Sequence, residues 1–406
     1  MTTQRAALDG IRVIDLTVWF QGPVAAQHLA DFGAEVIHVE RPKGGDQGRG
    51  VRSIKALPVG DWNQYFLVIN RNKKSLAVDL KQPQGREILY RLAEKSDVFL
   101  SNLAAENLAA WGLTADALHA VNPRLVYAVT SGYGRWATAT KPAFDMTVQA
   151  LTGLMNRLGE PGEPPIYLGM GSGDAFGGLL GALGILIALQ QRRRTGKGQI
   201  VDASLYGAQL LLAAPTLQAY LATGDARYAR QRSRRTPENP LWNPYPAHDR
   251  WLFLCVPNDD TSYATLRRVL GDPPAAREPR FASAAGRREH ATALVDALDP
   301  VFRERSAEDW TARLRAENLA VSPIGTLRDL AEDPQAWAND YLLETFCEEV
   351  KRTVTVRGLP IGLSKTPGRV ESLGPELGQD TELLLADLLG YTWDEIGTLK
   401  DAKVIP

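Results

Sequence analysis

The first part of the chain alternates between short β-branched segments and Ala- and Leu-rich segments. Residues 11–16 (Ile-Arg-Val-Ile-Asp-Leu) lie between turn residues that include Gly10 and Gly22, which is typical of a buried strand ending in a turn. Residues 24–32 predict a helix, and residues 35–40 predict a second strand. A strand, a helix and a strand in this order indicate a parallel sheet.

The same alternation continues to about residue 135. It predicts strands at residues 75–80, 97–100 and 124–130, and helices at residues 84–95 and 113–120. We therefore expect a Rossmann-type α/β domain over residues 8–135.

A long apolar helix is expected over residues 175–191. Within it Gly177, Gly178, Gly181 and Gly184 remove side chains from successive turns. Each glycine costs a helix up to about 1 kcal/mol, so we expect another backbone to pack closely against this helix.

The basic, proline-bearing segment 227–246 marks a change in composition, and we place a domain boundary near it. The pattern beyond it predicts a smaller domain, with a strand at 251–256 and helices at 261–270, 290–302 and 307–317. The C-terminal part adds a β-rich stretch over 343–362 and an amphipathic helix over 380–389.

Composition narrows the class of protein. The 406 residues suffice for two domains, and 46 basic against 47 acidic residues leave no net field to hold nucleic acid or an anionic membrane. Cys255 and Cys347 are too far apart for a zinc or dithiol motif. The N-terminus lacks an apolar leader, and the most apolar stretch, 179–189, falls short of the roughly 20 residues of a membrane span. We expect a folded cytoplasmic protein that binds neither nucleic acid nor membrane.

Most common catalytic motifs are absent from the sequence. The five histidines form no H-x-x-x-H pattern, so we expect no metal site. There is no G-x-S-x-G elbow and no phosphate-binding P-loop, which disfavours serine hydrolases and nucleotide phosphatases.

The most unusual feature is a run of glycines around one carboxylate, Gly169-Met-Gly-Ser-Gly-Asp-Ala-Phe-Gly-Gly178. Asp174 in this setting is accessible to a bulky group and can act as a nucleophile toward an activated acyl group, with backbone N–H donors holding the oxyanion. Two other interpretations stay open. Asp174 can be the N-cap of a helix starting at Ala175, or Gly169-x-Gly171 can belong to a dinucleotide site, although the spacing is not G-x-G-x-x-G.

The ordered set of motifs resembles the family III CoA-transferases, which include formyl-CoA transferase, carnitine CoA-transferase and the α-methylacyl-CoA racemases. The resemblance spans nearly the whole chain. Its markers are Leu8-Asp-Gly-Ile-Arg-Val-Ile-Asp-Leu16, Gln21-Gly-Pro23, Leu29-Ala-Asp-Phe-Gly-Ala-Glu-Val-Ile37, Val39-Glu-Arg-Pro42, Asn70-Arg-Asn-Lys-Lys-Ser-Leu76, Phe144-Asp145, Gly173-Asp174, Arg194-Thr-Gly-Lys-Gly-Gln199 and Leu388-Leu-Gly-Tyr391.

The resemblance implies a chemistry and an architecture. Asp174 would attack the thioester and form a mixed anhydride and then an aspartyl-CoA thioester, which favours the nucleophile over the cap. Coenzyme A would enter as the acyl-CoA substrate, with no tightly bound cofactor. The implied fold is a Rossmann-type large domain built from both chain ends plus a smaller α+β domain, in an interlocked-ring dimer. The expected bounds are 1–205 for the large domain, 206–225 for a linker helix, 226–325 for the small domain and 326–406 for the returning C-terminal segment.

The resemblance also implies a CoA site along the first strand and turn, with Arg41 near the nucleotide phosphates. Each position has an ordinary alternative, such as a surface charge for Arg41 or a core side chain for Val78. The implied CoA contacts are Val18, Trp19, Phe20, Gln21, Arg41, Val78, Asn102 and Lys141.

Two departures from the family pattern bear on the substrate. Phe144 stands where the racemases carry a histidine, which disfavours proton exchange beside the carbonyl. No glycine-rich loop occurs between residues 232 and 260, which disfavours formate and oxalate. Trp19, Phe20 and Phe144 suggest a pocket for a larger, partly apolar acid, and Arg49 and Arg52 could meet a second carboxylate.

We therefore expect a succinyl-CoA-type donor and a substituted dicarboxylate or aryl acid as acceptor. The partners would be these substrates and a second subunit, identical or homologous. The alternatives are an acyl-CoA racemase or isomerase, and a non-catalytic subunit of a heteromeric transferase.

Overall fold

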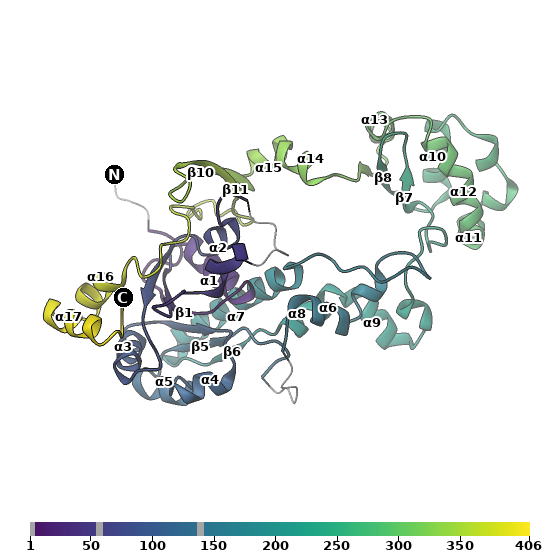
Figure 1. The fold of residues 1–406 in the computed structure, drawn as a ribbon. Coiled ribbons are helices and arrows are strands. Elements are labelled where there is room, and N and C mark those ends of the chain that lie inside the picture. Colours follow the sequence, from purple (N-terminus) through teal and green to yellow (C-terminus); the bar gives the residue numbers. More distant parts are fainter. Residues whose placement is uncertain (1–4, 54–59, 136–141) are drawn as a thin grey trace. The chain divides into compact units, whose positions relative to one another are not determined.

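A computed structural model of the protein describes residues 5–53, 60–135 and 142–406. Six parallel strands form one sheet in the order β3-β2-β1-β4-β5-β6 (Figure 1), which is the order of a doubly wound Rossmann sheet. The strands are β1 (Arg12–Leu16), β2 (Glu35–Glu40), β3 (Lys73–Ala77), β4 (Val98–Ser101), β5 (Val126–Val129) and β6 (Ile200–Asp202). The predicted parallel α/β architecture is confirmed.

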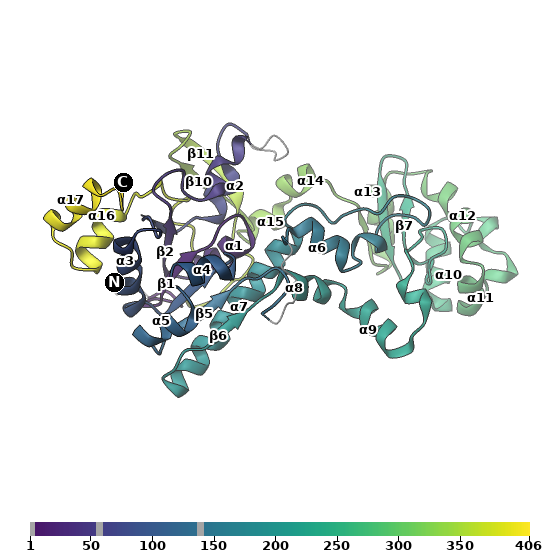
Figure 2. The ribbon, with the colours of Figure 1, turned by 60° about the horizontal axis from the view of Figure 1, so that its bottom comes forward.

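One face of this sheet is covered by α1 (Gln21–Asp31) and α7 (Ser172–Thr195), which lie side by side (Figures 1 and 2). The glycines of α7 allow the close approach that the sequence predicts. A Cβ atom at Gly178 would lie 2.6 Å from the carbonyl oxygen of Gln21, and one at Gly184 would lie 2.7 Å from Val201.

The opposite face is covered by α3 (Pro83–Glu94), α4 (Ala105–Ala110), α5 (Ala115–Val121) and the end of the chain. The expected helix over 380–389 is a short α turn, α16 (Thr381–Leu383), followed by a π turn, η6 (Leu384–Leu388), and then α17 (Trp393–Asp401). The Asp380 carboxylate and the Thr381 hydroxyl accept the backbone N–H groups of Ser75 and Ala77. The C-terminal segment is thus bonded directly to strand β3.

A hairpin of β10 (Leu342–Cys347) and β11 (Arg352–Arg357) packs on α2 (Gln64–Ile69). The remaining α-helices of the described residues are α6 (Asp145–Leu151), α8 (Leu205–Leu212), α9 (Ala214–Thr223), α10 (Asp260–Val269), α11 (Ala284–Glu289), α12 (Ala291–Phe302), α13 (Ala307–Ala316), α14 (Leu327–Glu332) and α15 (Pro334–Ala338).

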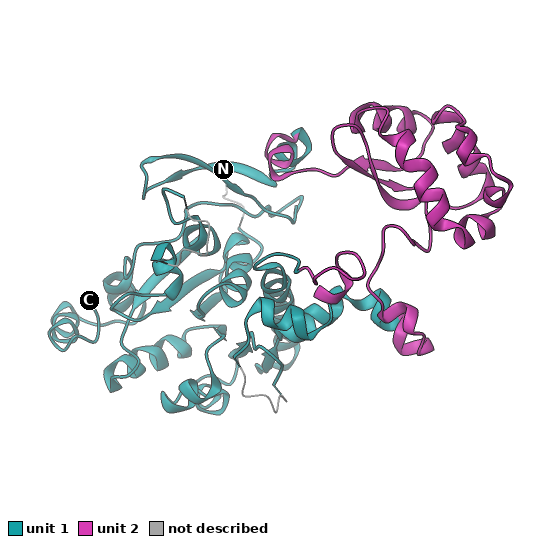
Figure 3. Cartoon of the chain, turned by 45° about the vertical axis from the view of Figure 1, so that its right-hand side comes forward, with its two compact units in different colours: residues 1–154, 167–218, 334–406 teal, residues 155–166, 219–333 magenta. Residues whose placement is uncertain are grey.

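The chain divides into two compact units (Figure 3). Unit 1 contains residues 1–154, 167–218 and 334–406, so both chain ends build it, and unit 2 contains residues 155–166 and 219–333. In unit 2 an antiparallel sheet packs one face on α10, α12 and α13. Its strands are β7 (Trp242–Pro246), β8 (Trp251–Cys255) and β9 (Val321–Pro323).

Among the described residues, α7 alone is long and apolar enough to cross a membrane, by length and composition only. Its apolar reach therefore exceeds the stretch 179–189 that the sequence suggests. Within its most apolar window, 44% is buried inside the protein.

Candidate active site

The candidate nucleophile, Asp174, lies on the first turn of α7. This helix begins at Ser172, and Gly171 occupies the N-cap with a φ of +81°, a conformation that favours glycine. Asp174 is thus the third residue of the helix and makes no cap hydrogen bond. The N-cap interpretation of Asp174 is therefore wrong.

The cap is supplied instead by Asp145, the first residue of α6. Its carboxylate accepts the backbone N–H of Gly171 at 2.7 Å and that of Gly173 at 3.1 Å. The side-chain amides of Gln149 and Gln209 donate to the same carboxylate, at 3.1 and 3.0 Å. A buried anion that receives four hydrogen bonds fixes the start of α7.

Gly173 is required by this arrangement, because a Cβ atom there would lie 2.3 Å from Asp145 Oδ1 and 2.2 Å from Gln209 Nε2. The N–H groups of Gly171 and Gly173 are occupied by Asp145, so these two donors are not available to hold an oxyanion.

Within the described part of the chain, the Asp174 carboxylate has no hydrogen-bond or ion-pair partner, although it is partly buried. Burial, and then the negative charge of Asp145, raise the pKa of Asp174 to about 7. Asp174 is therefore a poorly solvated and unusually basic carboxylate.

Aromatic side chains lie near the start of the helix that carries this carboxylate. The Phe20 ring lies 3.6 Å from where a Cβ atom at Gly171 would be, and its centroid is 5.6 Å from that of Tyr65. Burial, followed by the charges of Asp174 and Asp46, raises the pKa of Tyr65, so its hydroxyl stays protonated. Tyr65 was not singled out by the sequence, because nothing in its local pattern separates it from a core tyrosine.

Of the implied CoA residues, Val18 to Phe20 form the turn between β1 and α1, and Gln21 is the first residue of α1. The Asn102 side chain bonds both backbone polar groups of Val18, and Trp19 has a φ of +68°. The buried Gln21 amide donates to the carbonyl of Ala203 at 3.2 Å. The fold thus brings Val18, Trp19, Phe20, Gln21 and Asn102 to the carboxyl edge of the sheet, where the first turn of α7 also lies.

The other implied contacts differ in setting. Arg41 is exposed, and its Nε donates to the Gly45 carbonyl at 2.9 Å. Val78 is 1% exposed and belongs to the core, and its N–H donates to the Glu40 carbonyl at 2.8 Å. Lys141 lies outside the described residues.

A cluster of buried charged residues lies next to this turn. His38 Nδ1 is 3.0 Å from Asp15, and His38 Nε2 is 3.5 Å from Asp46 and 4.0 Å from Glu40. Burial lowers the pKa of His38, but the carboxylates of Asp15, Asp46 and Glu40 outweigh it and raise this pKa to about 10.

The cluster is completed by two further cations. Lys73 Nζ lies 2.8 Å from Asp15, and Arg49 binds Glu40 at 2.6 and 2.7 Å. With His38 protonated, three carboxylates face three cations, so the buried cluster is neutral overall.

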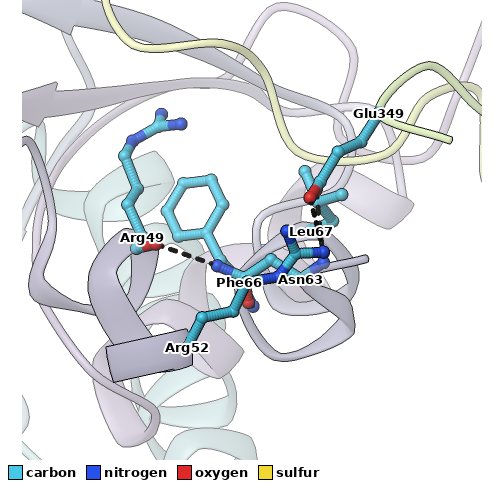
Figure 4. Close-up of a pocket in the computed structure, with 6 residues that line it drawn as sticks. All are labelled: Arg49, Arg52, Asn63, Phe66, Leu67 and Glu349. Carbon is cyan, nitrogen blue, oxygen red and sulfur yellow. Dashed lines mark hydrogen bonds and ion pairs between the residues drawn. The ribbon is translucent and has the colours of Figure 1, made fainter. Parts of the chain in front are cut away.

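Arg49 and Arg52 line a cavity of about 190 Å³ together with Asn63, Phe66, Leu67 and Glu349 (Figure 4). Arg49 is already paired with Glu40 and lies over the Phe66 ring, 4.0 Å from its centroid. Arg52 forms an ion pair with Glu349 at 2.8 Å. Neither guanidinium therefore presents an unpaired charge to a second substrate carboxylate.

Fold and site together define a doubly wound α/β protein with a basic carboxylate, without a partner among the described residues, at the ligand-binding edge of its sheet. Comparison with known proteins gives the family. Residues 8–381 match the family model of CoA-transferase family III. The chain belongs to CoA-transferase family III and is an enzyme that transfers CoA between carboxylic acids.

Individual relatives agree with this assignment. The succinyl-CoA–D-citramalate CoA-transferase of Chloroflexus aurantiacus is 32% identical, and the alignment covers 100% of both chains. The succinyl-CoA–L-malate CoA-transferase beta subunit of the same organism is 30% identical, over 100% of this chain and 99% of that one. A solved structure, a CaiB/BaiF family protein from Brucella suis, matches with a TM-score of 0.83 at 29% identity and covers 95% of this chain and 100% of that one.

Proposed function

We propose that this enzyme moves CoA from succinyl-CoA to a substituted dicarboxylate or an aryl acid, with Asp174 as the covalent carrier. The observation that carries the proposal is the state of the Asp174 carboxylate. It is partly buried, it has no partner among the described residues, and its pKa is raised to about 7. Loss of solvation and higher basicity both favour attack on a thioester carbonyl.

The transfer needs four substitutions at acyl carbons and no redox step. The Asp174 carboxylate attacks the succinyl thioester carbonyl, the C–S bond breaks, and CoA leaves as a thiolate from a mixed anhydride. The thiolate then attacks the Asp174 carbonyl of this anhydride, which releases succinate and leaves an aspartyl-CoA thioester.

The second half repeats these steps with the acceptor. The acceptor carboxylate attacks the aspartyl thioester, which gives a new anhydride and frees the CoA thiolate. Attack of the thiolate on the acceptor carbonyl forms the new acyl-CoA and restores the Asp174 carboxylate. In each step an anionic nucleophile adds and an anionic leaving group departs, so no net proton is consumed.

Two observations support the choice of substrates. Both relatives described above are named for succinyl-CoA as one partner and a substituted dicarboxylate as the other. The Phe20 and Tyr65 rings form an apolar wall at the start of α7, the helix that carries Asp174. Phe144, 60% exposed, precedes α6, whose first residue, Asp145, caps α7. Such a wall suits an acceptor larger than formate.

We also infer that a second subunit, identical or homologous, covers the outer faces of α7 and α8. Large apolar side chains are exposed there, namely Leu183, Leu186, Ile187, Leu211 and Leu212. The interlocked arrangement implied by the family resemblance would bury them, and one relative is itself named as a beta subunit. A solution mass of a single chain at micromolar concentration would contradict this inference.

The substrate proposal is tested by supplying the purified chain with succinyl-CoA and a panel of acids. The panel contains D-citramalate, L-malate, glutarate, an aryl acetate, formate and oxalate. We expect transfer to a dicarboxylate or to the aryl acid. Transfer to formate or oxalate alone would contradict the substrate class. Solvent deuterium in a 2-methylacyl-CoA without CoA exchange would favour the racemase, and CoA binding without transfer would favour a non-catalytic subunit.

A further inference from the structure

Asn102 joins the two halves of the sheet at its carboxyl edge. It follows β4, and its side-chain oxygen accepts the backbone N–H of Val18 at 2.9 Å while its side-chain nitrogen donates to the Val18 carbonyl at 2.7 Å. Val18 follows β1, and β1 and β4 are neighbours where the strand order reverses. Doubly wound sheets open their ligand crevice at this point. The two hydrogen bonds between Asn102 and Val18 therefore link the two sides of this crevice.

The residue after Val18 has an unusual backbone. Trp19 has a φ of +68°, a left-handed conformation that a bulky side chain adopts only when its surroundings impose it. Helix α1 begins two residues later, at Gln21, so the chain must turn within Trp19 and Phe20. The Trp19 N–H lies 3.5 Å from Asp46 Oδ1, at the outer limit of a hydrogen bond. The two short bonds from Asn102 are thus the stronger constraint on the turn.

This turn decides where Phe20 stands. The Phe20 ring packs against Gly171, the N-cap of the helix that carries Asp174, and lies beside Tyr65. A relaxed Trp19 would carry the ring away from Gly171. The position of the Phe20 ring therefore depends on the Asn102 side chain, which does not itself contact Asp174.

We propose that Asn102 is a positioning residue for CoA transfer. It holds the turn at Trp19 in its left-handed form, and so keeps the Phe20 ring against Gly171, at the start of the helix that carries Asp174, where the acceptor acid would bind. This inference rests on the proposed function, because the wall acquires a role only when an acid is seated next to Asp174.

The test compares Asn102→Ala with Asn122→Ala. Asn122 is a matched control, because its side chain also binds backbone groups. Its side-chain nitrogen donates to the carbonyls of Ala93 and Ser96, each at 2.9 Å, and its side-chain oxygen accepts the N–H of Arg124 at 3.0 Å. It precedes β5 and therefore lies at the amino edge of the same sheet, away from the crevice. Both variants lose hydrogen bonds to the backbone, but only one of them frees the Trp19 turn.

The readout is the acceptor KM with succinyl-CoA saturating, for a substituted dicarboxylate and for acetate, below the unfolding temperature of each variant. We expect Asn102→Ala to raise the KM of the larger acceptor by about tenfold or more and to reduce discrimination against acetate. Asn122→Ala should stay within about twofold of the wild type on both measures.

Equal losses in the two variants, or an unchanged KM and discrimination in Asn102→Ala, would overturn the positioning role while leaving the transfer function intact. A wild-type chain that moves CoA to no acid would instead overturn the proposed function, and this inference with it. The two failures are thus distinguished by the wild-type reaction alone.

Discussion

The carboxylate of Asp145 caps the helix that carries Asp174, so the Asp174 carboxylate does not serve as the cap. Asp145 receives the N–H groups of Gly171 and Gly173, and the charge that it brings also contributes to the raised pKa of Asp174. One carboxylate thus orders the helix terminus, and the other is left for chemistry.

The first prediction concerns the contact between Gly173 and this cap. Gly173→Ala places a methyl group within 2.3 Å of Asp145 Oδ1 and must displace it. We expect a loss of about 1–3 kcal/mol in the free energy of unfolding and at least about a tenfold fall in transfer rate. Gly397→Ala is the control, because Gly397 lies in α17 with no other group within 4 Å of the added atom. That variant should be neutral or slightly stabilising, and an equally neutral Gly173→Ala would contradict the capping account.

The second prediction concerns pH. Only the ionised form of Asp174 attacks, and its pKa is about 7, so the rate of acylation by succinyl-CoA should rise between about pH 6 and pH 8. Asp145→Asn removes the second cause of the raised pKa, so the rise should move to lower pH, with a smaller maximal rate because the cap is weakened. Rapid-quench measurement of CoA release checks this shift. Asp394→Asn, at an exposed position in α17, should leave the profile in place, and a profile that did not move in Asp145→Asn would count against the coupling.

The class of fold could be predicted from the sequence, but the residue that caps the helix of Asp174 could not. Short β-branched segments predict parallel strands because each strand is buried on both faces. The role of Asp145 as the cap was not predicted, because Asp145 and Gly173 are far apart in the sequence and come together only in the folded chain. Asp174, by contrast, directly precedes the predicted start of the helix. Strand β7 was not predicted from the sequence. Its Asn243 and Tyr245 face inward, but Pro244 and Pro246 are residues that disfavour a strand and interrupt the alternating pattern.

The third prediction concerns His38. Its folded pKa, about 10, lies above its ordinary value of 6.5, so its contribution to stability is complete below about pH 6.5 and is lost as the pH rises through 10. This contribution is on the order of 5 kcal/mol. We expect urea unfolding of the wild type to show a declining free energy from pH 7 to pH 10. His38→Gln should be less stable at pH 7 and nearly flat over that range.

The exposed His248 provides the control for this experiment, and His248→Gln should follow the wild-type curve. A His38→Gln variant with the same slope as the wild type would show that His38 does not carry the buried charge.

The fourth prediction concerns the attachment of the two chain ends. Arg71 binds the Asp31 carboxylate at 2.9 and 2.7 Å and also donates to the carbonyls of Arg357 and Gly358. Arg71→Met would leave Asp31 buried without its cation, and we expect a loss of about 3–5 kcal/mol. Limited proteolysis should also cut the β10–β11 hairpin sooner. Arg91→Met, which removes an exposed pair with Glu87, should cost at most about 1 kcal/mol, and equal costs for the two variants would contradict the account.

The most direct test of the central claim is to locate the covalent intermediate. The protein is incubated with succinyl-CoA, quenched with hydroxylamine, digested and examined by mass spectrometry. We predict a hydroxamate on the side chain of Asp174, and neither this modification nor CoA exchange in Asp174→Asn. A modification on any other residue, or exchange by Asp174→Asn at the wild-type rate, would contradict the assignment of Asp174 as the carrier.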